Sequence, residues 1–360
     1  MADLLKNLYN KEYINLLSSE LKSSYPAFKE EKFIESIFDG MWNDRELKER
    51  MRHISTSIHS HMPNNYTQTI DMLKNTFLNM NHSFSLENMI FQDYVEVYGL
   101  NEFEISMEAL KCFTLNSSSE FAIRQFILKY PHATMEQMKR WTKSDNHHVR
   151  RLASEGCRPR LPWAIALQEF KKEPREVLKI IDILKNDKSE YVRKSVANSI
   201  NDISKDNPHA VKKLTKEWIG MSEDIDWILK HGCRTLLKQS DKEILNLFGF
   251  NEVNNIDILD FHMPNNIRMG EELLFSFLLK SKEQLGKLRI EYAIDFLRQN
   301  NKYNKKVFKI SEGIFTKKSK TISKKYSFKP ISTRVYYKGL HELSILINGI
   351  EIIKKKFLIS

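Results

Sequence analysis

The sequence has no long apolar run and no secretion signal at its amino terminus. No uninterrupted apolar segment reaches the roughly eighteen residues that a helix needs to span a bilayer. The first residues also lack the basic and then apolar stretch that is typical of a signal peptide. We therefore expect no membrane segment and a cytoplasmic location.

Cysteine is scarce and occurs at three positions, Cys112, Cys157 and Cys233. An odd number cannot close into a set of disulfides, and no cysteine stands at a spacing that is typical of a metal site. The adjacent His147 and His148 share no such spacing with a cysteine either. The sequence therefore predicts reduced, mostly buried thiols, no metal ion and no organic cofactor.

Positive charge is in excess but unevenly spread. The net charge is +11, and residues 301–360 carry fifteen Lys or Arg against three Asp or Glu. Subtracting that surplus of twelve from +11 leaves −1 for the first 300 residues. A basic tail indicates a polyanionic partner such as nucleic acid. The lysines could instead keep strand edges unpaired, and the sequence leaves both interpretations open.

Helical periodicity and internal repetition dominate the body of the chain. Residues 146–153, 189–196 and 226–233 resemble one another at intervals of roughly forty residues, which is typical of HEAT-like helical repeats. We expect outer helices at 134–143, 173–186 and 207–219, each followed by an inner helix with a basic pair. The fold class is therefore mainly α, a HEAT-like helical-repeat solenoid.

The basic pairs of the inner helices would form a stripe if these helices stack in register. The predicted stripe consists of Arg150, Arg151, Arg193, Lys194, Lys230 and His231. A stripe of this kind is expected to contact DNA phosphates. The alternative is that each pair is simply a solvated part of an exposed helix face.

The pattern changes to strand-like alternation beyond residue 305. Asn348 and Gly349 between two apolar runs predict a tight hairpin turn. We expect two domains, a helical one at 1–300 and a small antiparallel β-sandwich at 305–360.

Residues 150–163 are the most informative stretch. Four arginines, among them Arg158 and Arg160, surround a helix break at Gly156 and Pro159. Paired guanidinium groups match the geometry of phosphate oxygens. This segment alone therefore predicts a phosphate-binding surface at a helix end.

Several longer segments resemble the AlkC-type DNA alkylation repair glycosylases. The similar segments are residues 151–156, 158–163, 190–198 and 201–206. In the tail, residues 331–334 with Tyr336, Tyr337 and His341 resemble the immunoglobulin-like domain that some members carry. The resemblance extends over the whole chain, and it implies that the sandwich is immunoglobulin-like and grips DNA, with Arg334 as one contact.

The resemblance implies excision of a cationic alkylated base, such as 3-methyladenine or 3-methylcytosine, from duplex DNA. The lesion is expected to stay largely in the base stack, and the protein to act as a monomer. Such a base is a good leaving group, so a carboxylate that stabilises the sugar cation and orients water suffices. The competing hypothesis is a non-catalytic helical-repeat scaffold that binds nucleic acid or a protein.

Three carboxylates match the active-site positions of that family, namely Glu120, Glu155 and Asp202. Each also has an ordinary explanation, as a helix-start residue, an ion-pair partner of Arg151 and a turn residue, respectively. Trp163 follows two prolines and is the predicted sugar-facing ring, although tryptophan is more often a core residue.

Overall fold

The computed structural model describes residues 4–80, 82–253, 255–331 and 334–360. The chain divides into two compact units, Met1–Asn207 and Pro208–Ser360. Within the described residues, no helix is both long and apolar enough to cross a membrane. Ser332 and Thr333, part of the tail segment that resembled an immunoglobulin-like domain, lie outside the described residues.

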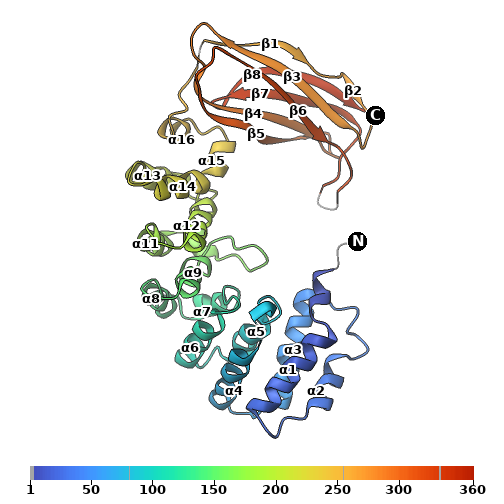
Figure 1. The fold of residues 1–360 in the computed structure, drawn as a ribbon, viewed down its shortest axis with the longest axis vertical. Coiled ribbons are helices and arrows are strands. Elements are labelled where there is room, and N and C mark those ends of the chain that lie inside the picture. The colour runs from blue at the N-terminus through green and yellow to red at the C-terminus, as the bar shows by residue number, and fades with distance from the viewer. Residues whose placement is uncertain (1–3, 81, 254, 332–333) are drawn as a thin grey trace. The chain divides into compact units, whose positions relative to one another are not determined.

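The regular elements described in the first unit are helices. They are η1 (Leu5–Leu8), α1 (Lys11–Ser24), α2 (Glu30–Ile37), α3 (Leu47–His61), α4 (Tyr66–Asn79), η2 (His82–Phe84), α5 (Met89–Tyr98), α6 (Phe103–Phe113), α7 (Ile123–Lys129), α8 (Pro131–Trp141), α9 (His147–Glu155), α10 (Gln168–Lys172), α11 (Arg175–Leu184) and α12 (Glu190–Ile203). In Figure 1, α4, α6, α8 and α11 form one row, and α5, α7, α9 and α12 form a second row beside it. This is the paired-helix arrangement that the repeats predict.

The helices of the repeats lie close to their expected positions. The predicted outer helices correspond to α8, α11 and, in the second unit, α13 (Pro208–Trp218). Pro131 and Pro208 are the first residues of their helices, where the missing N–H of proline costs nothing. Buried serines join α9 to α12, since the Ser154 and Ser195 hydroxyls lie 2.7 Å apart. The close packing of α9 on α12 brings distant polar residues together.

The second unit begins with helices and ends with a β-sandwich. Its other helices are α14 (Glu223–Gly232), α15 (Arg234–Lys238) and α16 (Lys242–Leu247). Its strands are β1 (Ile256–His262), β2 (Asn266–Ile267), β3 (Glu272–Ser281), β4 (Gly286–Leu297), β5 (Tyr303–Phe315), β6 (Ser319–Ser327), β7 (Gly339–Ile347) and β8 (Ile350–Ile359). They form a three-stranded sheet, β1-β3-β6, and a five-stranded sheet, β2-β8-β7-β4-β5. Apolar side chains of both sheets form one core that includes Phe277, Ile294, Phe328 and Ile345.

The sandwich begins at Ile256, so the predicted boundary near residue 300 is wrong. The strands before the predicted boundary include β4, which is continuously buried from Leu288 to Phe296 and lies between β5 and β7. Its polar positions Arg289 and Glu291 pair with each other at 2.6 Å and are buried, so neither side of the strand faces solvent.

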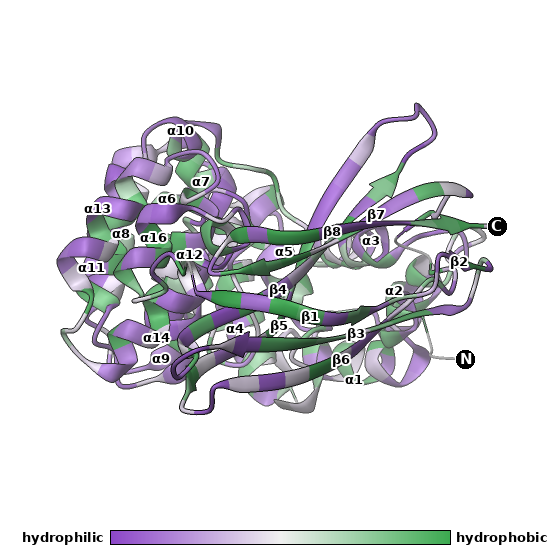
Figure 2. Ribbon diagram, turned by 90° about the horizontal axis from the view of Figure 1, so that it is seen from above, coloured by the Kyte–Doolittle hydropathy of each residue, from purple (hydrophilic) through white to green (hydrophobic). Residues whose placement is uncertain are grey.

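The hairpin expected at Asn348–Gly349 is present between β7 and β8. Both residues have positive φ, 48° and 79°, as a tight primed turn requires. The lysine- and serine-rich β6 is an outer strand of its sheet and is largely purple or pale in Figure 2. Charged residues on such a strand discourage pairing with another chain, so this part of the lysine excess has a structural explanation.

The thiols are placed as the sequence predicts. Cys157 and Cys233 are buried, Cys112 is half-buried, and all three are free. Burial raises the pKa of Cys157 to about 12 and that of Cys233 to about 11. These two thiols are therefore protonated and unreactive at neutral pH.

Candidate active site

A hollow of about 690 Å³ lies in the first unit at the end of α9. Its lining comes from α5, the segment between α6 and α7, α9, the loop after α9, and α12. The lining residues are Ser85, Leu86, Met89, Leu115, Asn116, Ser117, Ser118, Glu120, Phe121, His148, Arg151, Glu155, Arg158, Leu161, Pro162, Trp163 and Tyr191. The hollow thus gathers three of the four predicted catalytic residues, Glu120, Glu155 and Trp163.

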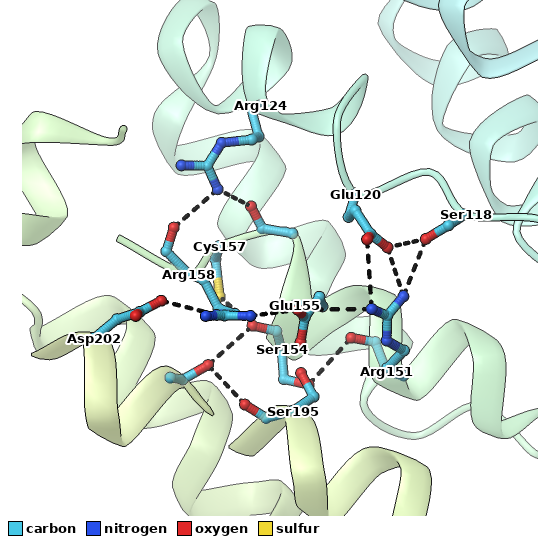
Figure 3. Close-up of polar contacts among 12 residues, drawn as sticks. Ser118, Glu120, Arg124, Arg151, Ser154, Glu155, Cys157, Arg158, Ser195 and Asp202 are labelled. Atoms are coloured by element: carbon cyan, nitrogen blue, oxygen red, sulfur yellow. Dashed lines mark hydrogen bonds and ion pairs between the residues drawn. The ribbon is translucent and has the colours of Figure 1, made fainter. Parts of the chain in front are cut away.

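An alternating series of carboxylates and guanidinium groups runs along this hollow. Arg158 donates from Nε to Asp202 Oδ2 at 2.8 Å and from Nη1 to Glu155 Oε1 at 2.6 Å. Arg151 donates from Nη1 to Glu120 Oε2 at 2.5 Å, and its Nη2 lies 3.6 Å from Glu155 Oε1. Figure 3 shows Glu155 between the two guanidinium groups. We call these five residues, Glu120, Arg151, Glu155, Arg158 and Asp202, the charge chain.

The charge chain is shielded from water. No side chain in it is more than 15% exposed. Each ionisable group in the charge chain has an oppositely charged neighbour, which offsets part of the cost of burying a charge. Arg158 contacts Oε1 of Glu155 at 2.6 Å, and Arg151 contacts the same oxygen at 3.6 Å. Glu155 therefore lines the hollow while both guanidinium groups contact one of its oxygens.

Local structure at the end of α9 places Glu155 and its partners. Glu155 is the last residue of α9, one helical turn after Arg151, and Gly156 is the C-cap. A Cβ atom at Gly156 would lie 2.7 Å from Ile123 Cγ2, so only glycine allows α9 to end this close to α7. Packing against α7 thus requires glycine at position 156, where the backbone is still helical, with a φ of −63° and a ψ of −33°.

Arg124 on α7 supports the backbone beyond Gly156. Its side chain is fully buried and donates to the carbonyls of Gly156 at 2.9 Å, Arg158 at 2.8 Å and Ile165 at 2.8 Å. Burial lowers the pKa of Arg124 to about 10. A guanidinium group shared among three carbonyls fixes the chain path around Glu155. Nothing in the sequence around Arg124 distinguishes it from a surface arginine.

Glu120 lies at the other end of the charge chain from Asp202. Burial raises its pKa above the ordinary value, and the positive charge of Arg151 opposes that shift. The Ser118 hydroxyl donates to Glu120, and Arg151 Nη1 also donates to Ser118 at 3.0 Å. Glu120 therefore fixes Arg151 and adds a carboxylate to the hollow.

Asp202 lies behind Arg158 and outside the lining of the hollow. It is 1% exposed, sits within α12 rather than in a turn, and its Oδ1 accepts from Lys205 at 3.2 Å. The guanidinium group of Arg158 separates it from Glu155. In this geometry Asp202 orients Arg158 instead of facing a substrate directly.

Two aromatic side chains flank the hollow. Trp163 is 62% exposed, so it is not a core residue, and it has a φ of 63°. The Tyr191 ring lies 4.8 Å from the Arg151 guanidinium carbon. Tyr191 is a site residue that the sequence interpretation missed, although it belongs to the segment 190–198 that carried the resemblance.

The predicted basic stripe is corrected in the first unit. Arg150 is buried and donates from two nitrogens to Asp187, at 2.6 and 2.9 Å, so it is a structural ion pair and not a DNA contact. Arg193 donates to the Asp187 carbonyl at 2.9 Å. Lys194 pairs with Glu190 at 2.8 Å on the exposed side of α12.

The surroundings of Arg158 and Arg160 also differ from the phosphate-binding surface that the sequence predicts. Arg158 is buried between two carboxylates, as described above. Arg160 donates from two nitrogens to Asp206, at 2.7 and 2.6 Å, with 39% of its side chain exposed. Asp202 in α12 therefore binds Arg158, and Asp206 just after α12 binds Arg160. Both carboxylates are more than forty residues away in the sequence.

The predicted DNA-binding residues of the second unit lie in different surroundings. Lys230 pairs with Glu312 at 3.0 Å, and the His231 ring stacks on Trp227 with centroids 5.3 Å apart. Arg334 donates to the Tyr326 hydroxyl and lies 5.3 Å from the Phe296 ring centroid. Arg334 also lines a hollow with a volume of about 560 Å³.

No metal-binding cluster is found in the part of the chain that the structure describes, because no three His, Cys, Asp or Glu side chains there could hold an ion together. The histidines His147 and His148 lie against each other, with ring centroids 4.4 Å apart, beside Tyr191.

Comparisons with known proteins agree with this architecture. Residues 111–221 match the family described as DNA alkylation repair enzyme, and residues 257–360 match the C-terminal Ig-like domain of the uncharacterised protein YhaZ. The chain is similar to alkylpurine DNA glycosylase AlkC of Pseudomonas fluorescens, bound to DNA containing an abasic site analog. The two are 35% identical, with a TM-score of 0.94, over 99% of this chain and 100% of that one. The chain belongs to the AlkC family.

The chain is also similar to the uncharacterized protein YhaZ of Bacillus subtilis. It is 44% identical over 351 residues, which is 97% of each protein. The predicted AlkC resemblance, the helical-repeat fold and the immunoglobulin-like domain are thereby confirmed. The domain match at residues 257–360 agrees with the strand boundary of the structure and not with the predicted boundary at 305.

Proposed function

We propose that the protein is a monofunctional DNA glycosylase that hydrolyses the N-glycosidic bond of cationic alkylated bases in duplex DNA. The observation that carries this proposal is the charge chain, in which Glu155 faces the hollow and two guanidinium groups hold it. The AlkC family membership supports an activity on alkylated DNA. The proposed substrates are 3-methyladenine and 3-methylcytosine, and excision would begin base excision repair.

The proposed reaction needs a group that stabilises positive charge on the sugar. The bond from C1′ to the base nitrogen breaks, and its electron pair leaves with the base, which neutralises the positive charge of the lesion. The sugar becomes cationic, and the Glu155 carboxylate stabilises it in a site shielded from bulk water. A water oxygen then bonds to C1′ and its proton passes to a carboxylate, which yields the free base and an abasic site. No cofactor enters these steps.

Each other member of the charge chain supports Glu155. Arg151 and Arg158 hold Oε1 of Glu155, and the side chain lines the hollow. Asp202 holds Arg158, and Glu120 holds Arg151. Arg151, Arg158 and Lys205 offset the three carboxylates of the chain, so the attraction for a cationic base or sugar comes from the nearby Glu155 carboxylate and not from a net charge. The exposed ring of Trp163 adds an attractive face for the cation.

The proposal includes how DNA is held. The lesion would stay largely in the base stack of a bent duplex, and a single copy of the protein would suffice. A chromosomal DNA substrate would place the protein in the cytoplasm of a bacterial cell.

A direct test is incubation of the protein with duplex DNA that contains one 3-methyladenine or 3-methylcytosine. We expect abasic sites, detected as strand breaks after alkali, and intact strands without alkali. Duplex binding with no abasic sites at high enzyme excess would favour the non-catalytic scaffold instead.

The immunoglobulin-like domain is proposed to grip the DNA backbone. Arg298, Lys306 and Arg334 line the hollow of about 560 Å³ together with the amides of Asn300 and Asn304. Partial burial and the nearby charges of Arg334 and Arg298 lower the pKa of Lys306. Like charges held together in this way attract an anion, and a DNA phosphate supplies one.

Neutralising these cations should weaken DNA binding in a salt-dependent way. Changing Arg298, Lys306 and Arg334 together to glutamine should reduce the slope of log affinity against log salt by about 0.9 for each phosphate that the variant no longer neutralises. Fluorescence anisotropy at several salt concentrations measures that slope. The control Lys282→Gln lies in the turn before β4, at the other end of that strand from the hollow. An unchanged slope in the triple variant would remove the domain from the proposed DNA surface.

A further inference from the structure

The loop that carries Trp163 joins α9 to α10. It projects beside the row formed by α5, α7, α9 and α12 (Figure 1). Trp163 has a φ of 63°, in the left-handed region that non-glycine residues rarely adopt. A ring that is 62% exposed provides little packing to stabilise such a backbone. A backbone hydrogen bond of 3.3 Å from the Ala164 N–H to the Leu161 carbonyl closes a turn that contains Trp163, and contacts from elsewhere in the chain can hold this turn in place.

Both ends of the loop are anchored. Near its start, Arg160 makes its two hydrogen bonds with Asp206 of the segment after α12. Near its end, Arg124 donates from Nε to the Ile165 carbonyl at 2.8 Å. These anchors lie three residues before and two residues after Trp163, with the turn from Leu161 to Ala164 between them.

Lys48 on α3 contacts the loop between those anchors. Its Nζ donates to the backbone carbonyl of Trp163, 115 residues away in the sequence. The same Nζ lies 4.5 Å from the ring centroid of Phe121, which follows Glu120 directly. Phe121 and Trp163 both line the candidate active-site hollow, from different segments. Lys48 therefore bridges two parts of its rim.

We propose that Lys48 is a positioning residue that latches the Trp163 loop in the conformation needed for base excision. This inference rests on the proposed glycosylase function. Lys48 does not line the catalytic hollow and acts through the Trp163 carbonyl, not on the substrate. The N-terminal helices thereby contribute to the geometry of the site although they carry none of the charge chain.

Lys48 has an exposed side chain, so its replacement should leave folding intact. Lys48→Met keeps the length of the aliphatic stem and removes the donor, whereas Lys48→Arg keeps a cationic donor. We expect Lys48→Met to lower the single-turnover excision rate about tenfold, the effect of one hydrogen bond to a charged group, and Lys48→Arg to restore most of it. The control Lys139→Met changes an exposed lysine of α8 and should leave the rate unchanged.

Two further measurements separate a latch from a phosphate contact. A lysine on a DNA phosphate would contribute about 0.9 to the salt slope of DNA binding, whereas removal of a latch leaves that slope unchanged. A double-mutant cycle with Trp163→Ala tests the route of action. If Lys48 acts through Trp163, Lys48→Met should have little further effect in the Trp163→Ala background. A reduced salt slope, or full additivity of the two substitutions, would overturn the proposal.

Hydrogen exchange tests the latch without reference to catalysis. We expect faster exchange over residues 160–167 in Lys48→Met than in the wild-type protein, and wild-type exchange in Lys48→Arg. Equal exchange in all three proteins would overturn the latch even if the protein is a glycosylase. Absence of excision by the wild type, with the expected exchange difference, would instead overturn the proposed function.

Discussion

Replacing Glu155 with glutamine should lower the single-turnover rate of base excision by about 10²- to 10³-fold. Glutamine has nearly the same shape but carries no charge, so the variant loses stabilisation of the sugar cation. The duplex should still bind, because in our account Glu155 interacts with charge that develops only during the reaction. Excision is measured with enzyme in excess over lesion-containing duplex, and affinity by anisotropy with the same duplex.

The matched control for Glu155 is Glu169→Gln. Glu169 forms a surface pair with Lys172 at 2.9 Å, and both side chains are largely exposed. This variant should excise at the wild-type rate, because exposed pairs contribute little to structure or stability. Wild-type excision by Glu155→Gln would show that another group stabilises the cation, and the assignment would then be wrong.

Replacing Arg158 with methionine should destabilise the protein by about 3–5 kcal/mol, because the substitution leaves Glu155 and Asp202 buried without their shared partner. The two ion pairs that this change removes are 2.6 and 2.8 Å long, between side chains that are at most 7% exposed. Urea denaturation, followed by helical circular dichroism, measures the change in the free energy of unfolding. Excision should fall as well, since no guanidinium group at position 158 would then fix Oε1 of Glu155.

Arg160 provides the matched control for Arg158. It lies two residues further along the chain and also pairs with a carboxylate of the α12 region, but its side chain is 39% exposed. Arg160→Met should therefore cost at most about 1 kcal/mol. Equal decreases of stability in the two variants would mean that burial of the charge chain does not determine its energetic importance.

The helical part of the fold could be predicted because it follows from local signals. Apolar residues at intervals of three and four and the repeated basic pairs place α8, α9, α11 and α12 within a few residues of their observed positions. The predicted sandwich is too short because it leaves out β1 to β4, and β4 is a central strand whose polar positions are paired and buried. An alternation was still present there, at Leu288, Ile290, Tyr292, Ile294 and Phe296.

The candidate site could be predicted only in part. The carboxylates and Trp163 stand out through the family resemblance, but their geometry depends on α9 packing against α12. That packing gives Arg158 a partner 44 residues away and Arg150 a partner 37 residues away. Long-range ion pairs of this kind have no local sequence signal. The sequence therefore identified which residues are unusual and not which of them bind each other.

The most direct test of this account is a single-turnover reaction of the full chain with duplex DNA that contains one 3-methyladenine. The reaction should release free 3-methyladenine and leave an equal amount of abasic sites that break only on treatment with alkali. The Glu155→Gln protein should bind the same duplex and release the base at least about a hundredfold more slowly. Tight binding of the duplex by the wild-type protein without release of the base would contradict the account.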